Sequence, residues 1–275
     1  MPLTLTLRQP TSIPIEVDTI RLETVREQTL DQIKATLVQY GNKQLALAEF
    51  FDVAGSAAED EHLVWVGDCS KVKLIAAGWL SGKVTVEGHA GMHLGAEMHG
   101  GEVCVHGNAG DWVGAEMKGG RIHVHGNAGN CVAAVYRGGR KGMTGGEIFI
   151  DGDAGNELGH TLRRGLIAVR GSAGAGLGFN MLAGTILVFG AAGIRPGAGM
   201  RRGTIGLLGP APAPPLLPTF KFTCQDRPDF LRVYLLHLHR HGFAVPDECL
   251  SAVYRRYRGD FLELGKGEIF VKSAV

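Results

Sequence analysis

Residues 101–119 read GEVCVHGNAGDWVGAEMKG, and the density of glycine in this stretch allows two structural interpretations. It is typical of a loop that binds phosphate through backbone N–H groups, or of one unit of a repeat whose corners need glycine. The spacing decides between them, because glycines recur every 19 residues on both sides of the stretch. The stretch is therefore one unit of a repeat, and it predicts a fold rather than a nucleotide site.

The repeat consists of a 13-residue unit, G-x-x-M-x-x-G-x-I-x-V-x-G, and a six-residue connector that usually reads NAGxxV. The glycine that closes each unit falls every 19 residues, except across one gap of 26 residues. At a corner, a positive φ or a close approach to the next unit leaves no room for a Cβ. We therefore expect these seven closing glycines to form structural corners: Gly88, Gly107, Gly126, Gly152, Gly171, Gly190 and Gly209.

Two aliphatic columns run through the repeat, two residues apart in every unit. Residues two apart point to the same side of a strand, whereas the residues beside them, such as Cys104 and His123, vary and point the other way. Stacked copies of such a strand bury all their apolar faces in one core. The columns are Val84, Val103, Ile122, Ile148, Ile167, Ile186 and Ile205, then Val86, Val105, Val124, Ile150, Val169, Val188 and Leu207.

We therefore predict an all-β fold, a single right-handed parallel β-helix or β-solenoid of about seven 19-residue coils. The repeat domain spans residues 63–209, and an N-terminal α/β segment at 1–62 is expected to cap the first coil. A proline-rich linker at 210–219 leads to a C-terminal tail at 220–275, which is expected to be mainly helical.

Composition and charge argue against several classes of partner. The net charge of +1 gives no strong field to attract nucleic acid or an anionic membrane. No apolar run approaches the ~18 residues needed to cross a bilayer, and the N-terminus does not have the pattern of a signal peptide. The five cysteines are widely spaced without a C-x-x-C, which is typical of reduced cytosolic thiols. We expect a cytoplasmic chain that binds neither nucleic acid nor membrane.

Motifs for catalysis and nucleotide binding are missing from the sequence. It contains neither G-x-x-x-x-G-K-[ST] nor G-x-G-x-x-G. His123-Val-His125 forms an H-x-H pair, and His106 is expected one coil from His125 on the outer face. Since the sequence indicates no third or fourth ligand, an exposed polar ladder is the simpler interpretation. We therefore predict no catalytic residue and no metal site in this chain.

The 26-residue gap contains a seven-residue insertion within Tyr136–Met143, which is basic through Arg137, Arg140 and Lys141. Insertions in solenoids form loops, often on a binding face. Two interpretations stay open. The loop is a solvated bulge or a contact between subunits, or it binds an anion such as a carboxylate or phosphate.

Several segments resemble a known family. The interrupted coil GGRKGMTGGEIFIDG (138–152) and the flanks LALAEFFDVAG (45–55) and VGDCSKVKLIAAG (66–78) are similar to the C subunit of formylmethanofuran dehydrogenase and of its bacterial relative, the formyltransferase/hydrolase complex. The tail YRRYRGDFLELGKGEIFV (254–271) resembles the bacterial subunit. The resemblance is strongest over about residues 60–210, which are more distantly similar to the C-terminal β-helix domain of the glutamate synthase large subunit.

The resemblance implies a function within a complex. Such a complex moves a formyl group from 5-formyl-tetrahydromethanopterin to methanofuran or a methanofuran-like carrier, then releases formate, as part of formaldehyde oxidation in one-carbon metabolism. It implies a formyltransferase subunit, an amidohydrolase-like subunit that holds zinc, and a further subunit. This chain would be a noncatalytic scaffold that binds no cofactor alone.

The resemblance also implies a carrier with a glutamate-rich tail, which cationic side chains would bind. The candidates are Arg137, Arg140 and Lys141 in the insertion, or the paired Arg163–Arg164 and Arg201–Arg202 at successive coil corners. Two other functions stay open: the C subunit of a molybdenum or tungsten formylmethanofuran dehydrogenase, and a stand-alone β-solenoid binding module.

Overall fold

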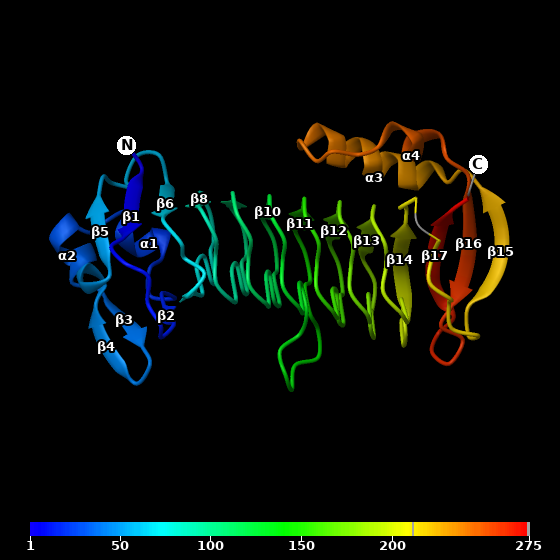
Figure 1. Cartoon of the computed structure of the whole chain (residues 1–275), viewed down its shortest axis with the longest axis horizontal. Helices are drawn as coiled ribbons and strands as arrows, with labels where there is room; N and C mark the ends of the chain where they lie inside the picture. The colour runs from blue at the N-terminus through cyan, green and yellow to red at the C-terminus, as the bar shows by residue number, and fades with distance from the viewer. Residues whose placement is uncertain (211, 274–275) are drawn as a thin grey trace.

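Thirteen strands form one long sheet in the computed structural model, which describes residues 1–210 and 212–273. The central strands are parallel and follow chain order along the long axis of the molecule (Figure 1). The seven repeat strands are β8 (Lys83–Glu87), β9 (Glu102–Val105), β10 (Arg121–Val124), β11 (Glu147–Ile150), β12 (Leu166–Val169), β13 (Thr185–Val188) and β14 (Arg202–Leu207).

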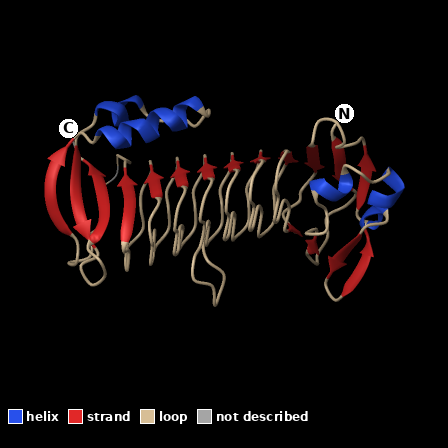
Figure 2. Cartoon of the chain, turned by 180° about the vertical axis from the view of Figure 1, so that it is seen from behind, coloured by secondary structure: helices blue, strands red, loops and turns tan. Residues whose placement is uncertain are grey.

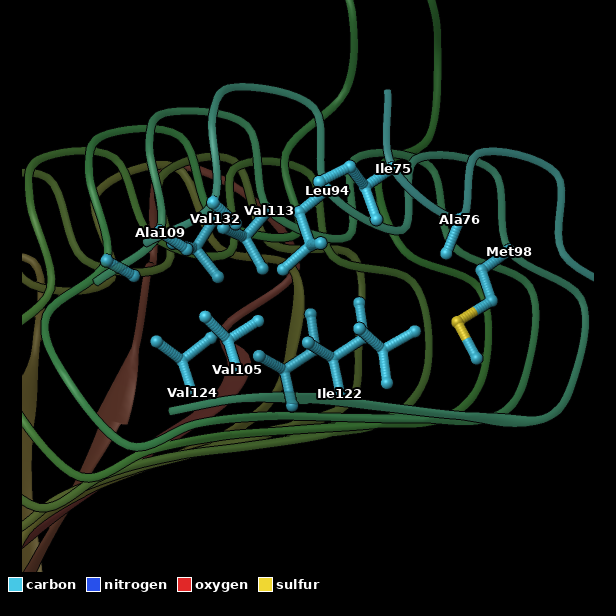
Figure 3. Close-up of a cluster of buried hydrophobic side chains, with 14 of the residues drawn as sticks. Ile75, Ala76, Leu94, Met98, Val105, Ala109, Val113, Ile122, Val124 and Val132 are labelled. Atoms are coloured by element: carbon cyan, nitrogen blue, oxygen red, sulfur yellow. The ribbon is translucent and has the colours of Figure 1, made fainter. Parts of the chain in front are cut away.

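The repeat strands pair in the register that the sequence predicts. Val84 lies beside Val103, and the same column continues to Ile205 without a shift. All fourteen residues of the two aliphatic columns are buried. Figure 3 shows Val105, Ile122 and Val124 facing Val113 and Val132 across the core. The prediction of one continuous core behind a mostly parallel sheet is confirmed.

The connectors stack on one another as the strands do. Their alanines form isolated parallel bridges from each repeat to the next, starting with Ala90 to Ala109. Asparagine side chains link the same segments, since the Asn108 Oδ1 accepts a hydrogen bond of 2.8 Å from the backbone N–H of Asn127. Asn127 does the same for Asp153, also at 2.8 Å. The NAGxxV connector is therefore a second hydrogen-bonded ladder, which we did not predict.

The closing glycines lie where consecutive backbones approach most closely. The N–H of Gly126 donates to the Gly107 carbonyl at 3.0 Å, and Gly152 donates to Gly126 at the same distance. A Cβ on Gly126 would lie 2.7 Å from the Gly107 carbonyl carbon and oxygen. Among the seven, only Gly88 has a φ in the left-handed region, at +147°. Close approach, rather than an unusual φ, therefore requires glycine at most of these corners.

The insertion leaves the core column intact. A third buried column contains Met98, Met117, Leu162, Met181 and Met200. Met143 is also buried and fills the place between Met117 and Leu162, because the N–H of Thr144 donates to the Met117 carbonyl at 2.7 Å and the N–H of Arg163 donates to the Met143 carbonyl at 2.9 Å. The seven extra residues form a loop that projects from the stack on the side opposite the helices α3 (Asp229–Arg240) and α4 (Asp247–Ser251) (Figure 1).

The N-terminal segment covers the first repeat with both strands and short helices. In the long sheet β8 is followed by β6 (His62–Val66), β1 (Leu3–Leu7) and β5 (Phe51–Ala54). A second sheet contains β4 (Lys43–Ala46), β3 (Leu37–Tyr40), β2 (Ile15–Glu16) and β7 (Val72–Lys73). The helices are α1 (Leu22–Val25), α2 (Leu30–Lys34) and η1 (Leu47–Glu49). Figure 2 shows these helices beside the N-terminal strands, whereas the C-terminal helices extend from the other end of the sheet towards its middle.

The C-terminal tail is not mainly helical, so this part of the prediction is wrong. It contains β15 (Lys221–Asp226), α3 (Asp229–Arg240), α4 (Asp247–Ser251), β16 (Tyr254–Gly259) and β17 (Lys266–Lys272). β17 pairs parallel with β14, and β16 and β15 follow it antiparallel. Without a partner the edge of β14 would leave backbone groups unpaired. β17 pairs with this edge and β16 with β17, so tertiary pairing overrides local helix propensity in the tail.

The linker at 210–219 has no helix or strand over its described residues, while Ala211, together with Ala274 and Val275 of the tail, lies outside the described residues. All five cysteines are free thiols. Within residues 1–210 and 212–273, no helix is both long enough and apolar enough to cross a bilayer.

Replacing Gly126 by Ala tests the close approach at the corners. The added Cβ meets the Gly107 backbone, which cannot move without shifting a neighbouring repeat. We therefore expect the free energy of unfolding to fall by about 1–3 kcal/mol and the Tm to decrease. Gly206→Ala is the control, because a Cβ there meets mainly the flexible ends of Leu187 and Leu208. Equal losses of Tm in the two variants, measured by thermal unfolding, would contradict this explanation.

Candidate functional site

The outer face of the sheet is divided into a covered part and an open part. The residues that lie between the two aliphatic columns and point outward, Cys104 and His123 among them, form the outward column. On β11 to β13 this column contains Phe149, Ala168 and Leu187, and all three side chains are buried. They pack in a second hydrophobic core with Leu231, Leu235 and Leu238 of α3. The sequence contains a signal for this cover that our prediction missed, since the outward column changes from polar to apolar at Phe149.

Polar and charged side chains bind the C-terminal end of α3 to the sheet. His237 hydrogen-bonds to the Glu147 carboxylate, and Arg121 donates to the same carboxylate at 2.9 Å. The Arg121 guanidinium also lies 3.3 Å from the Nε2 of His241 and 5.7 Å from the centroid of the Phe149 ring. These contacts hold α3 over β11 and end the covered part of the face beside β10.

A cavity of about 530 Å³ opens between α3 and the sheet. Its lining includes Glu147 and His237, which also make the contacts above, Thr185 from β13, Tyr234 from α3, and Arg164. One of the predicted cationic residues, Arg164, therefore lines a cavity that also contains the Glu147 carboxylate.

The open part of the outer face carries a histidine cluster, which we define as Cys104, His106, His123, His125 and Asp151. In-register pairing places His123 beside Cys104, and the His123 and His125 ring centroids are 4.2 Å apart. Burial raises the pKa of the Cys104 thiol and lowers the pKa of His123. The Asp151 Oδ2 lies 2.7 Å from the Nδ1 of His125 and 3.2 Å from the Nε2 of His123.

The predicted cationic residues fall on separate surfaces. Arg137, Arg140 and Lys141 are exposed on the inserted loop, and no ion pair involves them among the described residues. Aromatic contacts fix the base of this loop, since the Tyr136 hydroxyl lies 2.8 Å from the Nδ1 of His93 and its ring stacks on Trp112.

The two arginine pairs are not at successive corners, so that detail of the prediction is wrong. Leu182–Ala183 occupies the corner between Arg163–Arg164 and Arg201–Arg202, as the backbone hydrogen bonds of these corners show. All four arginines are exposed, and Arg201 pairs with Glu263 at 3.1 Å. The structure therefore gives no continuous cationic track along these corners.

Comparison with known proteins assigns the family. The family model described as the GXGXG motif matches residues 73–212, about half of the chain. The chain belongs to this GXGXG family. The matched region contains all seven repeat strands and all seven closing glycines.

Curated relatives share the repeat over part of their length. The C subunit of a molybdenum-containing formylmethanofuran dehydrogenase from Methanothermobacter marburgensis is 43% identical over 83 residues, which is 30% of this chain and 21% of that protein. The C subunit of a tungsten-containing formylmethanofuran dehydrogenase from Methanococcus maripaludis is 39% identical over 93 residues, or 34% of each chain. The alignments therefore span well under two thirds of the length of these relatives.

A solved structure matches almost the whole chain. It is the formyltransferase/hydrolase complex from Methylorubrum extorquens in complex with methylofuran. The TM-score is 0.89 at 34% sequence identity, and the match covers 98% of this chain and 100% of the chain in that complex. The resemblance drawn from the sequence is confirmed, and it extends over the N-terminal cap and the C-terminal strands.

Truncation of Leu235 tests whether α3 is held by the second core. Leu235 is 1% exposed, so Leu235→Ala should weaken the docking of α3 by about 2–5 kcal/mol. Hydrogen exchange should become faster in α3 while the strands β8 to β10 remain protected. Val233→Ala is the matched control on the same helix, because Val233 is 66% exposed. Unchanged exchange in Leu235→Ala would mean that other contacts hold the helix.

Proposed function

We propose that this chain is a noncatalytic scaffold subunit of a formyltransferase/hydrolase complex. One observation carries the proposal, namely the match over 98% of the chain to one chain of such a complex. The side chains of the repeat support a structural role, since asparagines and glycines at the corners are used in hydrogen bonds and close contacts between repeats.

The proposed complex converts 5-formyl-tetrahydromethanopterin to formate through a formylated carrier of the methanofuran type. The structure similar to this chain holds methylofuran, which supports a carrier of that class. Formyl transfer and hydrolysis are assigned to partner subunits, with zinc in an amidohydrolase-like partner, and the complex is placed in the cytoplasm. This chain contributes the surface on which those subunits assemble.

A dehydrogenase complex is the alternative within the family. It is less well supported, because the aligned segments of the molybdenum and tungsten relatives cover only 30% and 34% of this chain. A stand-alone binding module is a weaker alternative, since both comparisons lead to subunits of larger enzymes.

The repeat is further inferred to be a right-handed parallel β-helix. Partners in neighbouring strands and partners in the alanine bridges are separated by the same number of residues along the chain. This is expected for coils stacked on one another. Connections between parallel strands of one sheet are right-handed in nearly all proteins, which supports this hand. An electron-density or cryo-EM map that traced left-handed coils would refute it.

An apolar tip between β16 and β17 is the best candidate for a contact with another subunit. Phe261 and Leu264 are each 55% exposed and Leu262 is 82% exposed. Three large apolar side chains gathered at one exposed turn are typical of a protein contact site. We assign this tip to a partner within the complex.

Affinity purification of the tagged chain from its own cells tests both proposals. We expect mass spectrometry to identify a formyltransferase and an amidohydrolase-like partner, with zinc by elemental analysis. Molybdenum or tungsten with iron would support the dehydrogenase instead, and a chain that purifies alone would refute the scaffold.

Leu262→Asp should reduce recovery of the partners, whereas the control Leu80→Asp, at a leucine outside the tip that is 52% exposed, should not. Equal recovery would refute only the role of the tip.

The basic loop is proposed to bind a glutamate-rich tail of the carrier. Charge reversal at Arg140 and Lys141 should raise the KM for the carrier, because each exposed ion pair contributes about 0.2–1 kcal/mol, or roughly 2- to 30-fold for two pairs. Lys43→Glu, at an exposed residue of the N-terminal segment, is the control. An unchanged KM in the double variant of an intact complex would exclude the loop and leave the arginine pairs as candidates.

A further inference from the structure

Three side chains of neighbouring repeats converge on the open part of the outer face. Cys104 comes from β9, and His106 and His125 directly follow β9 and β10. One potential ligand atom of each residue lies within 4.8 Å of the others. From the sequence we predict only a ladder of histidines, because the 19-residue repeat aligns His106 with His125. Cys104 and His125 are 21 residues apart, so the repeat does not align them.

A carboxylate orients each of the two histidine rings. The Nδ1 of His106 lies 2.7 Å from the Glu87 Oε2, and the Nδ1 of His125 lies 2.7 Å from the Asp151 Oδ2. A carboxylate can only accept, so each Nδ1 carries the proton and donates it. The Nε2 of each neutral ring is then an unprotonated lone-pair donor. Histidines that bind metals are held in this way by a carboxylate on the other ring nitrogen.

The separation of one pair of donor atoms also matches the spacing of two ligands on one metal ion. The Cys104 Sγ lies 3.6 Å from the His125 Nε2. Zinc binds sulfur at ~2.3 Å and imidazole nitrogen at ~2.0–2.1 Å in tetrahedral geometry, which places the two ligand atoms about 3.5–3.6 Å apart. The separation of this pair therefore needs little change when a metal enters, and the His106 ligand atom lies within 4.8 Å of both.

We propose that Cys104, His106 and His125 form a binding site for a divalent transition metal, with Zn²⁺ as the best fit. One thiolate and two imidazoles favour Zn²⁺ over Mg²⁺ or Ca²⁺, which prefer oxygen ligands. Three protein ligands leave a fourth position open to water or a small anionic group. His106 and His125 are exposed, so that position is reachable from solvent.

Binding exchanges a proton for the metal. The Cys104 S–H bond breaks, the proton passes to solvent, and the sulfur–metal bond forms, while both imidazoles bind through existing lone pairs. Glu87 and Asp151 remain on the far ring nitrogens of His106 and His125 and balance the charge of the ion. His123 is the neighbour of this set rather than a member, since its Nε2 already lies 3.2 Å from Asp151.

Titration of the untagged, metal-free full chain with Co²⁺ tests the site. We expect one equivalent to bind, with a thiolate-to-cobalt charge-transfer band and the intense visible bands of a tetrahedral ion, and Zn²⁺ should displace it. Cys104→Ser should remove the charge-transfer band. Cys131→Ser is the control, because Cys131 is also partly buried but belongs to none of the candidate ligand clusters among the described residues.

Two further variants separate ligand loss from misfolding. His125→Asn should abolish tight binding, and Asp151→Asn should weaken it by about 10- to 100-fold because it releases the ring of His125. Circular dichroism should be unchanged in both. Absence of the cobalt bands in the wild-type chain, or their persistence in Cys104→Ser, would overturn the proposal. The titration needs no partner, so its result is independent of the proposed complex.

Discussion

The distance between neighbouring backbones at the corners constrains the rest of this structure. Strands in a sheet lie ~4.7–4.9 Å apart, and the closing glycines keep the corners at the same spacing as the strands. A Cβ at Gly152 would meet the Asn127 side chain at 2.2 Å and the Gly126 carbonyl oxygen at 2.7 Å. If the corners were wider, neither the strand ladder nor the alanine bridges could pair from repeat to repeat, and the inner columns would not meet in one core.

This constraint determines where the chain is free to vary. Inward positions must fill the core, and the connector asparagines must satisfy backbone N–H groups of the next repeat. Only residues of the outward column and of the 26-residue interval need neither fill the core nor bond to the next repeat. The basic loop lies in that interval and the histidine cluster lies on the outer face of the sheet. The loop and the covering helix α3 lie on opposite sides of the stack (Figure 1).

Periodicity predicts from sequence whatever each repeat has in common with its neighbours. The burial of Ile148 and Ile167 and their register followed directly, because a shift of one residue would turn the apolar face to solvent. Periodicity cannot predict contacts that occur only once and do not recur in every repeat. The shared core of α3 and the outward column, the pairing of β17 with β14 and the meeting of Cys104 with His125 join segments whose separation is not a multiple of the repeat.

The boundary of the helical cover explains why polar chemistry gathers at one place. Under α3 the outward column must be apolar, so Phe149 packs against Phe243 with ring centroids 5.8 Å apart. One strand earlier the cover ends, and His123 packs its ring against the edge of Phe149 at 5.9 Å. The histidine cluster therefore has an apolar wall on one side and solvent on the other, which lowers the local dielectric while leaving access to small molecules. A scaffold with this boundary can hold partners along its length and still present a polar, ligand-binding surface between them.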